Sequence, residues 1–252
     1  MTTLLEVRGL SKYYDEFPAL KDVSFQLQSG ELLALIGPNG AGKTTCFNAI
    51  NGQLEKTSGQ VIFNGNDISR LPPHKLWRLG VGRTFQITAN FLSMSVIENV
   101  QVALINWHSG MLNIFKRARK QHEQRALELL ELVNLAQHKD QACSILAYGD
   151  LKRLELAVAM ANHPKLLLMD EPTAGMGISE RAELMDLTHK IANERNIGVL
   201  FTEHDMDAVF GHADRIIVLH RGELIASGNA DEIRNDPRVR EVYLGEEINE
   251  AA

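Results

Sequence analysis

Hydrophobic and polar residues follow two patterns along the chain, and each pattern predicts a different kind of strand. Apolar and polar residues alternate over residues 23–28, which is typical of a strand with one buried face, and residues 60–63, which end at an Asn-Gly turn, are interpreted in the same way. Every residue is apolar over 32–36, 166–169 and 199–201, which is typical of strands buried on both faces of a parallel sheet. The sequence therefore predicts an antiparallel β layer beside a buried parallel sheet.

Helical patterns separate these strands. Residues 87–162 contain a capping-box sequence that begins at Ser95 and two segments of helical composition, at 117–133 and 151–161, so we predict a mainly helical block there. The remaining patterns predict one more helix and two strands joined by a turn, over residues 179–194, 215–219 and 223–226. We expect one α/β domain over residues 1–252 that carries a helical subdomain at 87–162.

The composition narrows the class of protein. With 252 residues, 44% of them hydrophobic, the chain is long enough to bury a full core without covalent cross-links. Its net charge of −6 argues against a nucleic-acid partner, which would require a basic face. The two cysteines, Cys46 and Cys143, lie in unrelated contexts, so neither a disulfide framework nor a zinc site is predicted. Polar residues interrupt each apolar run before the ~18 residues that span a bilayer, so we expect the chain not to cross a membrane.

Residues 37–44 read Gly-Pro-Asn-Gly-Ala-Gly-Lys-Thr and fit the pattern G-x-x-x-x-G-K-[ST]. They follow a predicted strand and precede a predicted helix at 43–51, which is the setting that a phosphate-binding loop requires. Backbone N–H groups would surround the phosphates, Lys43 would reach the β- and γ-phosphates, and the Thr44 hydroxyl would be a ligand of Mg²⁺. The residues predicted to contact Mg-ATP are Gly37, Pro38, Asn39, Gly40, Ala41, Gly42, Lys43, Thr44 and Thr45.

Three further positions carry candidate catalytic chemistry. The strand at 166–169 ends in Asp170 and Glu171, so that Asp170 can complete the Mg²⁺ shell and Glu171 can polarise the attacking water. His204 follows the strand at 199–201, at the end of the sheet where α/β proteins bind ligands. A lone histidine there is commonly structural, but beside the other motifs a γ-phosphate contact is the better interpretation. Gln86 could contact Mg²⁺ or the attacking water, and the alternative is an exposed loop amide.

Residues 146–153, Leu-Ala-Tyr-Gly-Asp-Leu-Lys-Arg, precede a predicted helix and complete a resemblance. We call them the signature segment. The order and spacing of the motifs resemble those of ATP-binding-cassette (ABC) ATPases, in which this segment usually reads LSGGQ. The resemblance implies a P-loop NTPase (RecA-like) core with an antiparallel β subdomain and an inserted α-helical subdomain. It also implies a head-to-tail dimer in which Tyr148 and Gly149 of one subunit close over ATP held by the other. Tyr14 matches the aromatic residue that stacks on adenine, with Tyr13 as an alternative.

Finer features resemble the ATPases of branched-chain amino acid importers. These features are the Leu-Ala-Tyr-Gly signature, residues 81–86, the tail at 233–245 and the long stretch at 106–121. The resemblance implies integral membrane permease subunits and a solute-binding protein as partners, and a place on the cytoplasmic face of the inner or plasma membrane. The alternatives are a lipopolysaccharide exporter, a soluble cassette ATPase of translation or DNA repair, and a nucleotide-regulated module without turnover. The basic residues of the long stretch could face a membrane, although a solvated helix face is the safer interpretation of them: Lys116, Arg117, Arg119 and Lys120.

Three residues depart from the common ABC pattern. Ala147 replaces a serine that donates to the γ-phosphate, and Asp150 replaces a glutamine, so we expect the Asp150 side chain to point away from phosphate. Gly177 stands where the loop that crosses the family's dimer commonly carries aspartate. We therefore expect weaker coupling between the two ATP sites.

Overall fold

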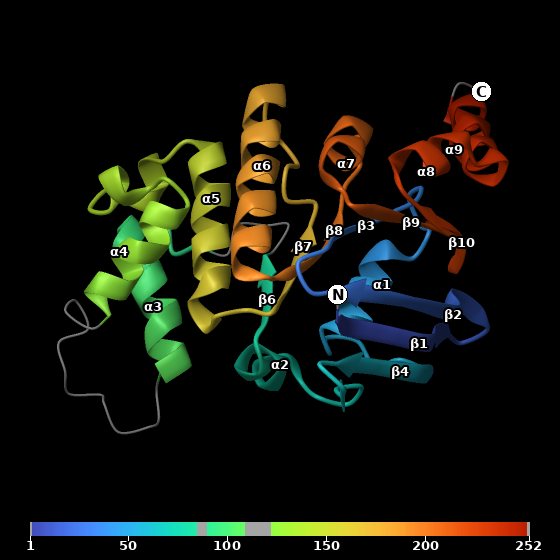
Figure 1. Ribbon diagram of the computed structural model, residues 1–252, viewed down its shortest axis with the longest axis horizontal. Helices are drawn as coiled ribbons and strands as arrows, with labels where there is room; N and C mark the ends of the chain where they lie inside the picture. The colour runs from blue at the N-terminus through green and yellow to red at the C-terminus, as the bar shows by residue number, and fades with distance from the viewer. Residues whose placement is uncertain (1, 85–89, 109–121, 251–252) are drawn as a thin grey trace.

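A six-stranded sheet forms the centre of the computed structural model, which describes residues 2–84, 90–108 and 122–250 (Figure 1). The strand order is β10-β9-β3-β8-β7-β6, and neighbouring strands are parallel except for the antiparallel pair of β9 and β10. The strands span Leu32–Ile36 (β3), Val81–Thr84 (β6), Leu166–Asp170 (β7), Gly198–Thr202 (β8), Arg215–His220 (β9) and Glu223–Gly228 (β10). Because β3, β8 and β7 are parallel neighbours, the loops that follow them lie at one edge of the sheet.

A second, antiparallel sheet has the order β2-β1-β4-β5 and confirms the predicted β layer. Its strands span Thr3–Tyr14 (β1), Phe17–Gln28 (β2), Ser58–Phe63 (β4) and Asn66–Asp67 (β5). The pairing of β1 with β2 contains several register shifts. These irregularities explain why no clear alternation in sequence predicted β1, whereas β2 and β4 were predicted.

Nine α-helices occur within the described residues. They span Lys43–Ile50 (α1), Pro73–Leu79 (α2), Val96–His108 (α3), Glu123–Leu132 (α4), Tyr148–Ala159 (α5), Ile178–Arg195 (α6), Met206–His212 (α7), Ala230–Asn235 (α8) and Pro237–Glu250 (α9). Helices α3, α4 and α5 pack together, on the left of Figure 1, and form the predicted helical block. No helix in this described part of the chain is both long and apolar enough to span a bilayer.

The central sheet separates two hydrophobic cores. Leu32, Ala34 and Ile36 of β3 face the core that contains the helical block, whereas Leu33 and Leu35 face the core that contains α1 and the antiparallel sheet. All five side chains are fully buried. Burial on both faces explains the continuous apolar runs of β3, β7 and β8, and it confirms that prediction.

Helix boundaries agree with the sequence in most places. The capping box at the start of α3 is confirmed, because Ser95 N–H donates to Glu98 Oε2 at 2.9 Å and Glu98 N–H donates to Ser95 Oγ at 3.3 Å. Helix α5 begins earlier than predicted, at Tyr148, so the signature segment enters its first turn. The prediction missed β6, which is short and contains Gly82 and Arg83. The division into one domain with a subdomain at 87–162 stays a prediction.

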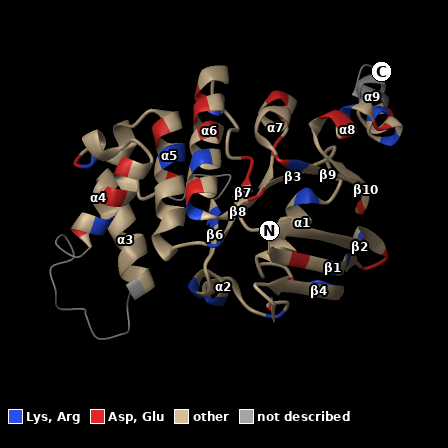
Figure 2. Cartoon of the chain, in the orientation of Figure 1, with Lys and Arg blue, Asp and Glu red and all other residues tan. Residues whose placement is uncertain are grey.

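Acidic and basic residues are mixed along the described chain. Figure 2 shows Lys and Arg scattered over several helices and strands, with Asp and Glu between them. This mixture agrees with the net charge of −6.

Candidate nucleotide-binding and active site

The phosphate loop, residues 37–45, connects β3 to α1 and is held tightly by its neighbours. Gly37 and Gly42 have positive φ angles of 151° and 106°. A Cβ atom at Gly37 would lie 2.0 Å from the carbonyl oxygen of Leu219, and one at Gly42 would lie 2.5 Å from that of Ala19. Only glycine fits at these two places, because both the backbone angle and the available space exclude a side chain. The sequence motif therefore fixes the path of the loop.

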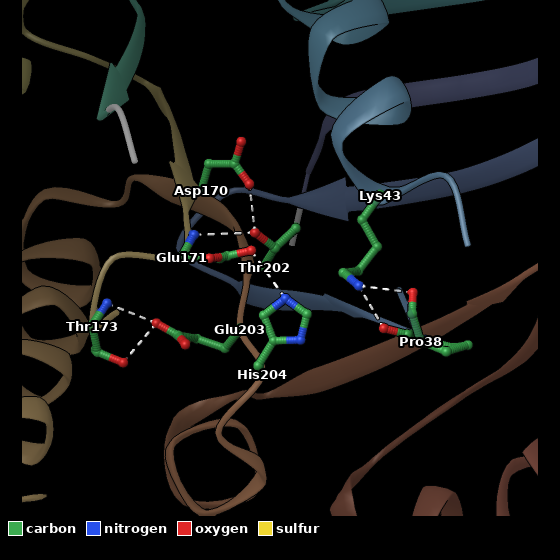
Figure 3. Close-up of polar contacts among 9 residues, drawn as sticks. Pro38, Lys43, Asp170, Glu171, Thr173, Thr202, Glu203 and His204 are labelled. Atoms are coloured by element: carbon green, nitrogen blue, oxygen red, sulfur yellow. Dashed lines mark hydrogen bonds and ion pairs between the residues drawn. The ribbon is translucent and has the colours of Figure 1, made fainter. Parts of the chain in front are cut away.

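Lys43 lies inside the curve of this loop. Its side chain is almost fully buried, with the residue 7% exposed, and its ammonium group donates to the carbonyl oxygens of Gly37 at 2.5 Å and Pro38 at 3.0 Å (Figure 3). Thr44 lies in the first turn of α1 and is exposed, as are Asn39 and Gly40 at the tip of the loop. The loop thus presents one cation and the start of a helix to the same space, which is the arrangement that binds phosphate.

Asp170 ends β7 and is 6% exposed. Its Oδ1 atom accepts a hydrogen bond from the Thr202 hydroxyl at 2.8 Å, and its Oδ2 atom lies 3.4 Å from Arg83 Nη2. Arg83 also donates to the side chains of Asn48 at 2.9 Å and Gln53 at 2.7 Å. Burial lowers the pKa of the Arg83 guanidinium, and the charge of Asp170 opposes this shift. The Asp170 carboxylate is therefore fixed between β6 and β8.

Glu171 and His204 form a carboxylate–imidazole pair in the site. Glu171 Oε1 lies 3.0 Å from His204 Nε2, and Glu171 N–H donates to the Thr202 hydroxyl at 3.1 Å (Figure 3). Glu171 has a φ of 49°, a conformation that costs a side-chain-bearing residue about 1–3 kcal/mol. Strain of this kind is concentrated at functional sites, and here it turns the Glu171 carboxylate toward His204.

Glu203 is a site residue that the sequence did not reveal. It is 4% exposed, and its Oε1 atom accepts hydrogen bonds from the backbone N–H and the hydroxyl of Thr173, at 2.8 and 2.7 Å. Burial raises the pKa of the Glu203 carboxyl, and the Thr173 hydrogen bonds oppose that shift by favouring the charged form. Thr202 and Arg83 were missed as well, although a polar residue at the end of an apolar strand was a usable signal for Thr202.

The residues present fit a magnesium ion that is shared with a substrate phosphate. Among the residues that the structure describes, no group of three or more His, Cys, Asp or Glu side chains could hold a metal ion alone. Mg²⁺ is usually bound by one or two protein oxygens, water and substrate phosphates, so Asp170 and Thr44 are a sufficient donor set. Gln86, the third predicted ligand, lies outside the described residues.

Tyr14 and Tyr13 end β1 beside the phosphate loop. They pair with Phe17 and Pro18 at the start of β2, and the next residue, Ala19, is the one that contacts Gly42. Tyr14 is 49% exposed and Tyr13 is 43% exposed, so each has ring surface available for stacking. The ammonium group of Lys12 lies 5.0 Å from the centre of the Tyr14 ring. Adenine stacking by Tyr14, with Tyr13 as the alternative, stays a prediction.

The signature segment is not part of this cluster. Tyr148 and Gly149 lie in the first turn of α5, which is separated from α1 by α6 and α7 in Figure 1. The Tyr148 ring packs over Gly175, and Gly149 packs against the Glu180 side chain. Thus one chain brings together the phosphate loop, Asp170, Glu171 and His204, and it leaves the signature segment on another surface. No hydrogen bond of Asp150 is described, so the direction of its side chain stays a prediction.

A phosphate loop between a buried strand and a helix, with a carboxylate pair at the end of another parallel strand of the same sheet, defines a P-loop nucleoside triphosphatase. The sequence comparisons give the family. The ABC transporter family profile matches residues 20–174, and a profile described as branched-chain amino acid ATP-binding cassette transporter matches residues 223–249. The chain belongs to the ABC transporter family.

Relatives match over nearly the whole chain. The chain is 41% identical to the high-affinity branched-chain amino acid transport ATP-binding protein LivG of Salmonella typhimurium, with 96% of this chain and 98% of that protein covered. It is 38% identical to BraF of Pseudomonas aeruginosa, a protein of the same description, with the same shares covered.

Solved structures agree with the predicted fold class. An ATP-binding cassette of an ABC transporter in its ADP conformation has a TM-score of 0.88 and 32% identity, with 97% of this chain and all of that chain covered. A dimeric bacterial ABC transporter cassette has a TM-score of 0.77 and 26% identity, with 90% of this chain and 99% of that chain covered. The family and these cassettes confirm the ABC ATPase fold and support ATP hydrolysis.

Proposed function

We propose that this chain is the ATP-hydrolysing subunit of an importer for branched-chain amino acids. The observation that supports ATP hydrolysis is the position of Glu171. Its carboxylate lies 3.0 Å from His204, beside the buried Asp170. The similarity to LivG and BraF over 96% of the chain, together with the profile match at residues 223–249, supports the amino acid substrate. The same relatives favour an importer over the lipopolysaccharide exporter.

Each residue has one task in this proposal. Lys43 exchanges the carbonyl oxygens of its own loop for β- and γ-phosphate oxygens, and the N–H groups at the start of α1 hold the same phosphates. Asp170, Thr44 and Gln86 would hold Mg²⁺, which when bound neutralises charge on the phosphates. Glu171 orients the attacking water and accepts its proton, as a carboxylate within hydrogen-bonding reach can do.

His204 keeps the Glu171 carboxylate in place through Nε2, and because both ring nitrogens of a charged imidazole donate, it can contact the γ-phosphate at the same time. The contact with Glu171 supports this role, because the imidazole lies between the carboxylate and the space in front of the phosphate loop (Figure 3). Tyr14 would stack on the adenine ring.

The site is completed by a second ABC ATPase subunit, either a copy of this chain or a paralogue, in a head-to-tail dimer. Tyr148 and Gly149 begin α5, which is separated from α1 by α6 and α7 in Figure 1, and this separation supports a contact with phosphates bound by a partner. The N-terminus of α5 has no side-chain cap, which leaves its first N–H groups available to a phosphate. The dimeric relative cassette supports this arrangement.

Integral membrane permease subunits are the proposed docking partners, with a solute-binding protein acting through them. We infer a position on the cytoplasmic face of the membrane, where ATP is available. The names of the relatives, which are ATP-binding proteins of transport systems, support this inference.

Phosphate release tests the hydrolytic proposal. The wild-type chain, supplied with its permease subunits, should release phosphate from Mg-ATP, and Glu171→Gln should reduce the rate at least 100-fold while ATP still binds. The matched control Glu194→Gln lies on the exposed side of α6 and should keep the wild-type rate. If the wild-type complex does not hydrolyse ATP, the chain is a nucleotide-regulated module and the proposal is wrong.

The transported solute needs a separate experiment. Purification of the chain from its native membranes should recover permease subunits and a solute-binding protein, and leucine should increase ATP hydrolysis by that assembly in vesicles. Hydrolysis that does not respond to leucine, isoleucine or valine would refute the amino acid assignment.

A further inference from the structure

The loop after β8 contacts the segment after β7 at successive residues. Residues 203–205 form the β8 loop, and residues 171–177 form the β7 segment, which leads into α6. His204 lies 3.0 Å from Glu171, and Glu203 accepts two hydrogen bonds from Thr173 (Figure 3). These contacts follow one another along the β7 segment. They form because β7 and β8 are neighbouring parallel strands, so the loops that follow them lie side by side.

Asp205 adds a third contact on the same side. Its carboxylate forms an ion pair with Arg181 of α6, and Arg181 Nε donates to the carbonyl oxygen of Met176 at 2.8 Å. Asp205 also caps α7, because its side chain accepts from Ala208 N–H at 3.0 Å. The β7 segment is therefore attached to the β8 loop at its beginning, its middle and its end.

Glu203 differs from the other two residues of the β8 loop because it is almost fully buried. Removing a carboxylate from water is unfavourable, and an apolar side chain of similar volume would join the two loops at a lower cost. The Glu203 carboxylate provides directional hydrogen bonds that an apolar side chain lacks. Its Oε1 atom accepts from both the backbone N–H and the hydroxyl of Thr173. This pair of hydrogen bonds fixes the orientation of the Thr173 backbone, which a purely apolar contact would not do.

The orientation of Thr173 is transmitted to Glu171. Only Pro172 separates the two residues, and its ring fixes the backbone angle φ, so the chain between them is stiff. Glu171 itself is held at φ 49°, and its N–H donates to the Thr202 hydroxyl. With Glu203 on one side of Glu171 and Thr202 on the other, the backbone that carries the catalytic carboxylate is fixed at both ends.

We propose that Glu203 is a positioning residue that holds Thr173 and thereby keeps the Glu171 carboxylate in its contact with His204. This inference rests on the proposed role of Glu171 in ATP hydrolysis. Glu203 does not touch the reacting atoms in this scheme, so its loss should affect turnover and leave ATP binding to the phosphate loop intact.

Steady-state hydrolysis by Glu203→Met separates these two effects. Methionine has a similar length and no carboxylate, so kcat should fall about 10- to 100-fold, as expected when a catalytic group is misplaced by about 1 Å. The Kd for ATP should stay within about two-fold of the wild-type value, because the bonds of Lys43 are not altered. Glu203→Gln keeps an oxygen acceptor for Thr173 and should recover most of kcat. Glu194→Met, the same change at an exposed site of α6, is the matched control.

Hydrogen–deuterium exchange gives a second measurement that needs no turnover. In Glu203→Met, amide exchange should accelerate about ten-fold or more within residues 171–177 and stay unchanged within residues 37–45. A kcat within two-fold of the wild-type value would overturn the proposal, as would faster exchange over the whole chain. If the wild-type complex does not hydrolyse ATP, the proposed function fails. Even in that case, unchanged amide exchange at residues 171–177 in Glu203→Met would refute the proposal that Glu203 fixes this segment.

Discussion

The phosphate loop and the signature segment are both short turns that lead into a helix, yet the chain builds them in different ways. The phosphate loop is fixed by close backbone packing and by its own lysine: Gly37 and Gly42 lie too close to β9 and β2 to admit a side chain, and Lys43 donates to two carbonyl oxygens of the loop. In the signature segment, Ala147 occupies the N-cap position of α5 and offers it no side-chain cap. The Tyr148 ring packs over Gly175 of the β7 segment, and the ammonium group of Lys152 lies 5.6 Å from its centre.

This difference shows where each half of the site takes its geometry from. The phosphate loop is preformed, whereas the signature segment depends on the β7 segment and the start of α6. The same β7 segment begins at Glu171, beside His204, and reaches the Tyr148 ring at Gly175. One stretch of chain therefore carries the proposed catalytic carboxylate and also packs against the signature segment, which in the proposed dimer would face the site of the partner.

Removing the cation of the phosphate loop should have the largest effect on ATP binding. Lys43→Met should weaken ATP binding about 100-fold, because hydrogen bonds from a charged donor to phosphate contribute about 1.5–3 kcal/mol each and ~1.4 kcal/mol corresponds to a factor of ten. Titration calorimetry with ATP measures the change. The matched control is Lys190→Met, whose side chain is exposed on α6. A Kd within three-fold of the wild-type value would show that the loop backbone alone binds the phosphates.

The same contrast explains how much of the site could be predicted from the sequence. The phosphate loop is one contiguous stretch of nine residues, so its sequence motif was sufficient to predict it. The buried strands were predicted because burial on both faces requires an apolar residue at every position. Glu203 and Thr173 lie 30 positions apart and meet only because β7 and β8 are neighbours. Contacts that depend on strand order leave no local pattern.

Arg83 shows a second reason why part of the site was missed. A short strand with a glycine and a charged residue in its middle does not resemble a buried strand. In the fold, Arg83 is accommodated because Asp170, Asn48 and Gln53 accept its hydrogen bonds. The partners that accept hydrogen bonds from this charge come from two other parts of the chain, α1 with the turn after it and the end of β7, so β6 could be recognised only after folding.

Adding an N-cap side chain to α5 tests whether the signature segment lacks the local stabilisation that the phosphate loop has. Ala147 has an extended backbone with φ −61° and ψ 152°, which is the conformation of an N-cap residue. Ala147→Ser should therefore raise the free energy of unfolding by about 1 kcal/mol, measured by urea denaturation, and leave the Kd for ATP of the single chain unchanged. Ala147→Val adds volume without an acceptor and should give no such gain. Equal stability of the two variants would mean that the first N–H groups of α5 are already satisfied.

The smallest expected effect concerns Gly177, at the end of the β7 segment, and the coupling between the two ATP sites of the proposed dimer. Gly177 has φ −68° and ψ 160°, which any residue adopts, and the nearest atom to an added Cβ is Glu180 Oε2 at 3.7 Å. Gly177→Asp should thus be accommodated with a change in stability below about 1 kcal/mol, since an N-cap carboxylate is favourable and its repulsion by Glu180 opposes this. We expect the Hill coefficient of ATP hydrolysis to rise, because the variant restores the charged residue that the family commonly carries in the loop between the two sites. Gly177→Asn is the uncharged control of the same shape. An unchanged Hill coefficient in Gly177→Asp, or an equal rise in Gly177→Asn, would show that the charge at this position does not couple the sites.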